Sequence, residues 1–333
     1  MFWAKSVSFD AAKDIPSLEG KVILVSGASS GLGKQAVLEY AQHNPRLIYL
    51  GARSADKANA AAKEIKEKYP KAAIEFLELD VASFASVKKA AATVLSTTDR
   101  LDILMLNAGI MAHPPGLTAD GYELQIGTNH MGHALLTKLL LPLLLKTAAG
   151  TTTNGSQAKP SDVRVVTVAS NGHIYATAPG IHFQTLRTPA DEMGPLGRYF
   201  QSKLANVLWT RQLAALYPSL TVVSMHPGTV QTNLMNNTDD MGFFMRGLTK
   251  GLVKMNAFTP VEKGVRSQLW ASVAPRSTTK DGKAKPDDFG KVVSGEYYEP
   301  VGVSGKMSAL GRDDELTKKF WEWTEKELAG HVA

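Results

Sequence analysis

The chain of 333 residues contains no cysteine. This absence excludes disulfide bonds and thiolate metal sites, and it is compatible with a reducing compartment. The first residues lack the continuous apolar run of a signal peptide. The longest apolar stretch, residues 133–145, contains Lys138 and Pro142 and is too short to cross a bilayer. The sequence therefore predicts a cytoplasmic protein without a transmembrane segment.

Long runs of positive charge are also missing. The net charge is +6, but no run of Lys and Arg exceeds two residues. A nucleic-acid interface would need a clustered basic face with aromatic residues, so no nucleic-acid partner is predicted. No HExxH motif is present, and His130 and His133 lack acidic neighbours. We therefore predict no metal site and assign these two histidines to helix packing.

Short apolar segments alternate with helical patterns from residue 21 to about residue 226. Strands that are apolar almost throughout are typical of a parallel sheet with helices on both faces. The sequence therefore predicts an α/β fold, a three-layer doubly wound parallel sheet, in a single domain over residues 1–333. The predicted strands are residues 21–26, 46–51, 73–79, 101–106, 163–169, 220–225 and 295–299. The predicted helices are residues 34–43, 55–69, 83–95, 124–145, 198–216 and 259–272. Loops are predicted at 147–162, 176–197 and 277–290, and residues 277–333 are predicted to form a C-terminal extension.

A glycine-rich turn, SGASSGLG over residues 26–33, joins the first predicted strand to the first predicted helix. In this position, glycines permit a sharp turn, close approach of the backbone to a ligand, and close packing of the helix on the sheet. The helix N-terminus also favours a pyrophosphate. The turn therefore predicts dinucleotide binding by Gly27, Ser29, Ser30, Gly31, Leu32 and Gly33.

The end of the second predicted strand bears on the choice of dinucleotide. An acidic residue there would bond the ribose hydroxyls, whereas a basic residue suits a 2′-phosphate. Here the strand is followed by Arg53 and Ser54, with Lys34 as a further candidate, so the sequence favours NADP(H). The alternative is that Arg53 is a surface arginine.

Two further strand ends add candidate cofactor contacts. Asp80 and Val81 end the third strand, where the carboxylate could meet the adenine edge. Asn107, Ala108 and Gly109 end the fourth, and their small size would let the backbone lie against a cofactor. Because Asp, Asn and Gly favour turns in any setting, ordinary loop chemistry is the alternative.

Tyr199 and Lys203 lie four residues apart in a predicted helix and so share one face. A nearby ammonium stabilises a phenolate, which lowers the pKa of a tyrosine from about 10. The pair alone is weak evidence, since Tyr and Lys are common on solvated helices.

Together these residues resemble the short-chain dehydrogenase/reductase family. The matches cover about residues 20–235 and comprise SGASSGLG, NAG at 107–109, Asn129, Ser170, Tyr199 with Lys203, and PGTV at 227–230. Residues 127–133 and the Ala52-Arg53 strand end are similar to the retinol dehydrogenase and WW-domain oxidoreductase branch. Residues 294–300 resemble its fungal members. The departures are Ser26 in place of the frequent Thr, Ala169 before Ser170, and a long step from Ser170 to Tyr199.

The resemblance implies a Rossmann fold and a role for each matched residue. Tyr199 would exchange a proton with the substrate oxygen, and Lys203 would lower the Tyr199 pKa and bind the nicotinamide ribose. Ser170 would hydrogen-bond the substrate oxygen, and Asn129 would hold a water in a proton relay. The turn formed by Pro227, Gly228, Val230 and Thr232 would clamp the nicotinamide carboxamide.

The substrate side is less defined. Residues 233–260 are rich in Met and Phe and are interpreted as a lid over a bulky apolar substrate, with a membrane- or partner-docking segment as the alternative. His173, His182 and Phe183 either line the pocket or lie in a surface loop. The predicted function is NADP(H)-dependent reduction of a lipophilic ketone or aldehyde, or oxidation of an alcohol, in secondary metabolism. A catalytically idle dinucleotide sensor is the second hypothesis, and monomer and homodimer are both left open.

Overall fold

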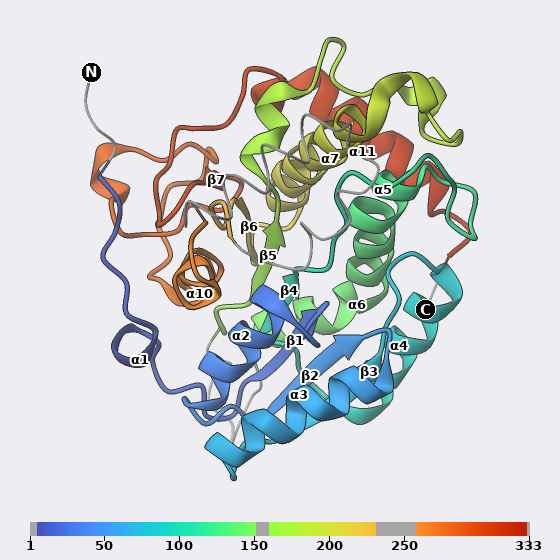
Figure 1. The fold of residues 1–333 in the computed structure, drawn as a ribbon. Helices are drawn as coiled ribbons and strands as arrows, with labels where there is room; N and C mark the ends of the chain where they lie inside the picture. Colours follow the sequence, from blue (N-terminus) through green and yellow to red (C-terminus); the bar gives the residue numbers. More distant parts are fainter. Residues whose placement is uncertain (1–4, 151–159, 231–257, 332–333) are drawn as a thin grey trace.

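A parallel sheet of seven strands forms the centre of the computed structural model, which describes residues 5–150, 160–230 and 258–331 (Figure 1). The strand order is β3-β2-β1-β4-β5-β6-β7, and every neighbouring pair is parallel. The strands are β1 (Val22–Ser26), β2 (Leu47–Ala52), β3 (Ile74–Glu78), β4 (Ile103–Leu106), β5 (Arg164–Val168), β6 (Thr221–Met225) and β7 (Tyr297–Tyr298).

Helices cover both faces of the sheet. Side chains alternate along each strand, so Val22 and Leu24 of β1 enter the core beneath one set of helices while Ile23 and Val25 enter the other. Both faces are buried, which explains why the strands are apolar throughout. One face is covered by α4 (Phe84–Thr97), α6 (Gly132–Ala149) and α7 (Gly194–Leu216). The other is covered by α2 (Gly31–Ala41), α3 (Ala55–Lys68) and α10 (Arg266–Val273). The predicted three-layer Rossmann fold is confirmed.

Two predicted helices are interrupted in the structure. The segment 124–145 consists of α5 (Leu124–Ile126), a π-helical turn η1 (Gly127–Met131) and α6. Gly132 follows the π turn at a point of close contact, because a Cβ there would lie 1.8 Å from Val81 O. The segment 259–272 is divided into α9 (Val261–Gly264) and α10. The helix predicted at 198–216 begins earlier, with Pro195 in its first turn.

A long C-terminal helix, α11 (Asp314–Glu327), was not predicted. Asp313 caps it by accepting a hydrogen bond from Leu316 N (2.8 Å). Its buried side packs against α7, where Trp209 and Trp321 stack at 6.4 Å. The spacing of Leu316 and Phe320 would have indicated this helix. Six short elements complete the described part of the segments predicted as loops, connections or the C-terminal extension: α1 (Ala11–Asp14), η2 (Asn171–Tyr175), η3 (Phe183–Thr185), η4 (Asp191–Met193), η6 (Pro286–Asp288) and η7 (Leu310–Arg312).

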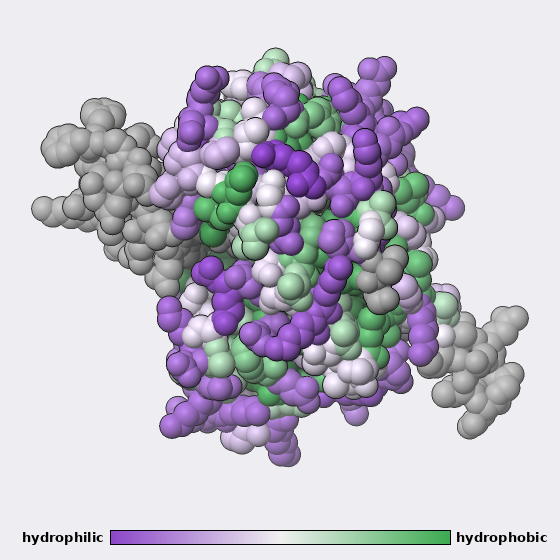
Figure 2. Space-filling view, turned by 90° about the vertical axis from the view of Figure 1, so that its right-hand side faces the viewer, coloured by the Kyte–Doolittle hydropathy of each residue, from purple (hydrophilic) through white to green (hydrophobic). Residues whose placement is uncertain are grey.

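Figure 2 views the molecule from the right-hand side of Figure 1. On this face, hydrophilic side chains surround separate hydrophobic patches. Among the described residues, no helix combines the length and apolarity needed to span a bilayer.

Candidate active site

Four turns that follow strands meet at one edge of the sheet. They begin near Gly27 after β1, Asn107 after β4, Ser170 after β5 and Pro227 after β6. The strands are parallel, so their carboxyl ends share this edge, and the strand order reverses between β1 and β4. A doubly wound sheet binds ligands in the crevice at such a reversal. The fold thus brings the predicted cofactor and catalytic segments together.

The Tyr199 and Lys203 side chains lie one turn apart on α7, and both are buried. Lys203 Nζ donates a hydrogen bond to Val168 O at the end of β5 (2.9 Å) and lies 5.6 Å from the centroid of the Tyr199 ring. Ser170 follows Val168 by two residues, and its hydroxyl accepts a hydrogen bond from Gly172 N (3.0 Å). Three of the predicted catalytic groups therefore converge at the end of β5.

Burial shifts the protonation of this pair in an unexpected direction. From the sequence, Lys203 was expected to lower the pKa of Tyr199. Burial instead raises the Tyr199 pKa, and a hydrogen bond with the Ser170 hydroxyl opposes the shift. Burial also lowers the pKa of Lys203 to about 8. The phenol is therefore held in its protonated, proton-donating form.

Asn129 lies in the π turn η1 and is fully buried. Its Oδ1 accepts from Ile110 N (2.8 Å), and its Nδ2 donates to Ile110 O (3.0 Å) and Ser202 Oγ (2.9 Å). A Cβ on Gly109 would lie 3.1 Å from Asn129 Oδ1 and 3.6 Å from Lys203 Nζ. Both amide hydrogens of Asn129 are used within the protein, so its side chain positions the surrounding segments.

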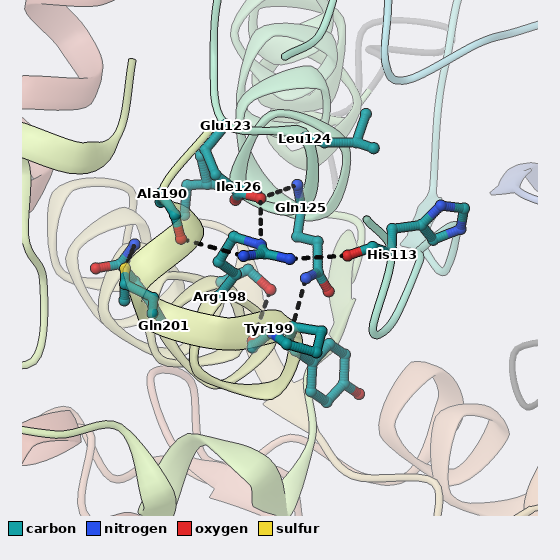
Figure 3. A network of polar contacts seen from close by, with 12 residues as sticks. His113, Glu123, Leu124, Gln125, Ile126, Ala190, Arg198, Tyr199 and Gln201 are labelled. Carbon is teal, nitrogen blue, oxygen red and sulfur yellow. Dashed lines mark hydrogen bonds and ion pairs between the residues drawn. The ribbon is translucent and has the colours of Figure 1, made fainter. Parts of the chain in front are cut away.

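A buried ion pair lies beside Tyr199. Arg198 Nε is 3.6 Å from Glu123 Oε1, and both side chains are at most 1% exposed. The guanidinium also donates to Ala190 O (3.1 Å) and His113 O (2.9 Å). Figure 3 shows it turned toward Glu123 and away from the Tyr199 ring. This pair was not predicted from the sequence.

Glu123 also caps the segment that leads to Asn129. Its carboxylate accepts hydrogen bonds from Gln125 N (3.0 Å) and Ile126 N (2.7 Å) at the start of α5. Burial raises the Glu123 pKa, and the two amides and Arg198 oppose that shift. The ion pair therefore ties the start of α7 to the π turn that carries Asn129.

The glycine turn is shaped by close contacts. Gly27 has φ +66°, and a Cβ there would lie 2.8 Å from Ala108 Cα. A Cβ on Gly33 would lie 2.4 Å from Gly27 O, so only glycine lets α2 approach this closely. Asn107 Nδ2 donates to Ser26 O (2.9 Å) and Gly27 O (3.4 Å), so this side chain holds the glycine turn.

The N-terminus of α2 follows this turn. Its N-cap residue, Ser30, makes no capping hydrogen bond through its side chain among the described residues. The first amides of α2 are therefore left to bind an anion such as a pyrophosphate. Ser29, Gly31 and Leu32 belong to the same turn and are partly accessible.

The two candidates for a 2′-phosphate differ in their availability. Arg53 is exposed and makes no ion pair with any described residue, and Ser54 caps α3 by accepting from Lys57 N (3.4 Å). Lys34 is engaged, since its Nζ lies 2.5 Å from Glu64 Oε2.

Asp80 makes the hydrogen bonds of an ordinary turn, which was the alternative to a contact with the adenine. Its Oδ1 accepts from Ala82 N (3.0 Å), and its own amide donates to Ser86 Oγ (2.9 Å). Oδ2 has no hydrogen bond among the described residues. The Val81 backbone lies against Gly132, so it is packed by α6.

The turn after β6 is described as far as Val230. Gly228 has φ +92°, as a sharp turn after Pro227 requires. The Val230 side chain packs against Gly264, where an added Cβ would lie 2.3 Å from it. Only the Val230 backbone could therefore face a cofactor. Thr232 and residues 233–257 of the predicted lid lie outside the described residues.

The three loop residues that were left with two alternatives, the pocket or a surface loop, lie in different surroundings. His173 is buried, donates from Nδ1 to Ser170 O (2.8 Å) and accepts from Ser308 N (3.1 Å), so it braces Ser170. Phe183 packs against Phe320 and Trp323 of α11. His182 is partly exposed in the same loop.

Two buried polar residues near Tyr199 and Lys203 were not predicted from the sequence. His226 Nδ1 and Tyr297 Oη are buried without hydrogen-bond partners among the described residues. Burial lowers the His226 pKa to about 4, and the charge of Lys203 contributes to the shift. The Tyr297 pKa is raised by burial, and Tyr199 is among the groups that add to this. Tyr297 lies within residues 294–300, the segment that resembles fungal members of the branch.

A cavity of about 1050 Å³ lies away from these residues. It is formed between the second half of α7, residues 276–283 and the start of α11, and its basic lining includes Arg211, Arg276 and Lys280. None of the predicted catalytic residues lines it. The convergence of turns, rather than cavity size, therefore locates the candidate active site.

Comparisons with known proteins give related sequences over most of the chain. A family model described as short chain dehydrogenase matches residues 21–170. The short-chain dehydrogenase/reductase drtF of Aspergillus calidoustus is 36% identical, over 94% of this chain and 95% of that protein. Human retinol dehydrogenase 13 is 32% identical, over 92% and 83%.

Solved structures show the same fold. An uncharacterized protein from Mycobacterium paratuberculosis superposes with a TM-score of 0.68 at 27% identity, covering 96% of this chain and 97% of the other. An NADPH-bound carbonyl reductase from chicken fatty liver gives 0.55 at 23% identity, covering 85% and 97%. The second likeness supports the fold alone.

Proposed function

The chain belongs to the short-chain dehydrogenase/reductase family, in its retinol dehydrogenase-like fungal branch, and we propose that it is an NADP(H)-dependent oxidoreductase of lipophilic small molecules. The reaction transfers hydride between the nicotinamide and a carbonyl or alcohol carbon. The observation that carries the proposal is the convergence of Tyr199, Lys203 and Ser170 at the end of β5, at the same sheet edge as the glycine turn.

The residues at this edge fit a dinucleotide. Gly27 and Gly33 close a turn that side chains would block, and the first amides of α2 are available to a pyrophosphate. The backbone after Pro227 would hold the nicotinamide carboxamide. When bound, the cofactor supplies or accepts the hydride, which no amino-acid side chain can do.

The side chains handle the proton and the developing charge. In reduction, the Tyr199 hydroxyl gives its proton to the carbonyl oxygen, and in oxidation the phenolate takes it back. Ser170 donates a hydrogen bond to the same oxygen and stabilises its negative charge. Lys203 carries its positive charge 5.6 Å from the Tyr199 ring, where it stabilises the phenolate left after proton transfer.

A Tyr199→Phe variant tests the acid/base role. Turnover of a panel of ketones, aldehydes and alcohols should fall about 10²- to 10⁴-fold. NADPH binding, followed by cofactor fluorescence, should persist and serves as the control for folding. Unchanged turnover would mean that Tyr199 is not the proton donor, and no turnover by the wild-type chain would favour the dinucleotide sensor instead.

The preference for NADP(H) rests on Arg53. This exposed guanidinium is free to fork onto a 2′-phosphate, and no acidic residue occupies the end of β2. Arg53→Glu should raise the KM for NADPH at least tenfold more than the KM for NADH. Lys66→Glu makes the same charge change at the far end of α3 and should leave the ratio unchanged. Equal effects of Arg53→Glu on both cofactors would overturn the preference.

Exposed apolar side chains near Ser170 support a lipophilic substrate. Ile174 is 46% exposed and Tyr175 is 60% exposed, and the Tyr175 ring lies 5.4 Å from that of Phe200, next to Tyr199. Such residues would contact an apolar molecule entering the site. The proposal extends to secondary metabolism because residues 294–300 resemble fungal members of the branch.

A further inference from the structure

An unbroken chain of buried hydrogen bonds links the glycine turn to the catalytic helix. Ser26 Oγ lies 2.9 Å from His133 Nε2, and His133 Nδ1 lies 3.1 Å from Asn129 O. Asn129 Nδ2 donates to Ser202 Oγ (2.9 Å), which in turn donates to Tyr199 O (2.7 Å). The side chains of Ser26, Asn129, His133 and Ser202 are all at most 3% exposed.

The contacts of His133 fix its tautomer. A carbonyl oxygen can only accept, so Nδ1 must carry the hydrogen that it donates to Asn129 O. Burial lowers the His133 pKa to about 4, and the positive charge of Lys203 contributes to the shift, so the ring is neutral near pH 7. Nε2 therefore has no hydrogen and accepts from the Ser26 hydroxyl.

This tautomer determines which hydrogen bonds the Ser26 hydroxyl donates and which it accepts. A hydroxyl has one hydrogen, and His133 Nε2 takes it at a shorter distance than the alternative acceptor, Met105 O (3.4 Å). The lone pairs of Ser26 Oγ then accept from Asn107 N (2.9 Å) and Ala108 N (3.0 Å). His133 thus orients Ser26 as an acceptor for two amides of the turn at 107–109.

The chain closes on itself at the active site. Gly109 ends that turn, and a Cβ there would nearly touch Asn129 Oδ1 and Lys203 Nζ. Asn129 O, in turn, receives the hydrogen bond from His133. The turn that faces the cofactor is therefore held from two sides, by Ser26 and by Asn129, and His133 is bonded to both.

We propose that His133 is a positioning residue that aligns the turn at 107–109 for dinucleotide binding by holding the Ser26 hydroxyl. The inference rests on the proposed dinucleotide-dependent function but concerns cofactor affinity rather than the chemical step. Without the acceptor at Nε2, the Ser26 hydroxyl can rotate, and the binding-competent turn becomes a fraction of the population. The apparent dissociation constant rises by the inverse of that fraction.

Two amide variants separate the two bonds of His133. Gln places its amide where Nε2 lies and can still accept from Ser26, whereas Asn reaches only the position of Nδ1 and can donate only to Asn129 O. His133→Asn should raise the dissociation constant of NADPH about tenfold, measured by cofactor fluorescence. His133→Gln should stay within about threefold of wild type, and kcat at saturating NADPH should change little in either variant.

A double-mutant cycle with Ser26→Ala tests the hydrogen bond between Ser26 and His133 by removing the hydroxyl. The Ser26→Ala variant is informative even if one variant at position 133 folds poorly. Ser26→Ala should weaken NADPH binding about tenfold, and adding His133→Asn should weaken it little further because the shared bond is already lost. Additive losses, or equal binding by the Gln and Asn variants, would overturn the proposal. A wild-type chain that binds NADPH but turns over no substrate would overturn the proposed function and leave the binding cycle intact.

Discussion

Two buried cations lie five residues apart on α7, and they differ in whether a carboxylate pairs with them. Arg198 faces a carboxylate, Glu123, and its guanidinium also bonds two carbonyl oxygens. Lys203 donates to one carbonyl oxygen, and no carboxylate among the described residues pairs with it. A paired guanidinium stays charged and fixes its surroundings, whereas an unpaired buried ammonium has a lowered pKa and can take part in proton movement. The comparison supports the proposal that Lys203 takes part in the reaction, whereas Arg198 positions the helix.

The largest effect on stability is expected at Arg198, and replacing each of the two cations by Met compares them. Arg198→Met leaves the Glu123 carboxylate buried without its partner, so the free energy of unfolding should fall by about 3–5 kcal/mol. Lys203→Met removes a buried charge that lacks a carboxylate partner, so stability should be retained while turnover is lost. Chemical denaturation and steady-state kinetics on both variants check this. Equal destabilisation by the two substitutions would contradict the comparison.

Neutralising Glu123 in the Arg198→Met variant should recover part of the lost stability. Glu123→Gln in the Arg198→Met background removes the unpaired charge, while an amide oxygen can still accept from Gln125 N and Ile126 N. The double variant should be about 1–3 kcal/mol more stable than Arg198→Met alone, as coupling between contacting residues predicts. A double variant that is less stable than Arg198→Met would mean that the ion pair is not what matters at this position.

Contacts between buried polar side chains that are far apart in the chain were not predicted from the sequence. The glycine turn, the strands and the Tyr199–Lys203 face follow from patterns within a few residues. Arg198 with Glu123, and His133 with Ser26, join residues far apart in the chain. Which buried polar groups meet depends on how α6 and α7 pack, and the π turn that carries Asn129 was not predicted either. The direction of the Tyr199 pKa depends on packing in the same way, since burial raises it and only the hydrogen bond with Ser170 opposes the shift.

The Lys203 pKa gives stability and activity opposite pH dependences. Its pKa is about 8 in the folded chain and about 10.4 when unfolded, so between these values the unfolded chain binds more protons and stability rises with pH. The gain should be on the order of 2–3 kcal/mol and absent from Lys203→Met. Turnover should instead fall above about pH 8, as the ammonium that stabilises the phenolate is lost. Chemical denaturation of the cofactor-free protein at several pH values measures the stability, and pH–rate profiles measure the turnover. If the stability of Lys203→Met rose with pH by the same amount, the gain would belong to other groups.

The smallest effect is expected at a third cation of the same helix. Arg211 Nη2 lies 2.6 Å from Asp314 Oδ1, but the Asp314 side chain is 85% exposed. Water already solvates this carboxylate, and the Arg211 guanidinium keeps its bonds to Gly311 O (2.9 Å) and Thr317 Oγ1 (2.8 Å) when the carboxylate is removed. Asp314→Asn should therefore lower the free energy of unfolding by less than about 1 kcal/mol, and added salt should reduce the difference further. A loss near that of Arg198→Met would show that burial of the partner carboxylate does not set the strength of these pairs.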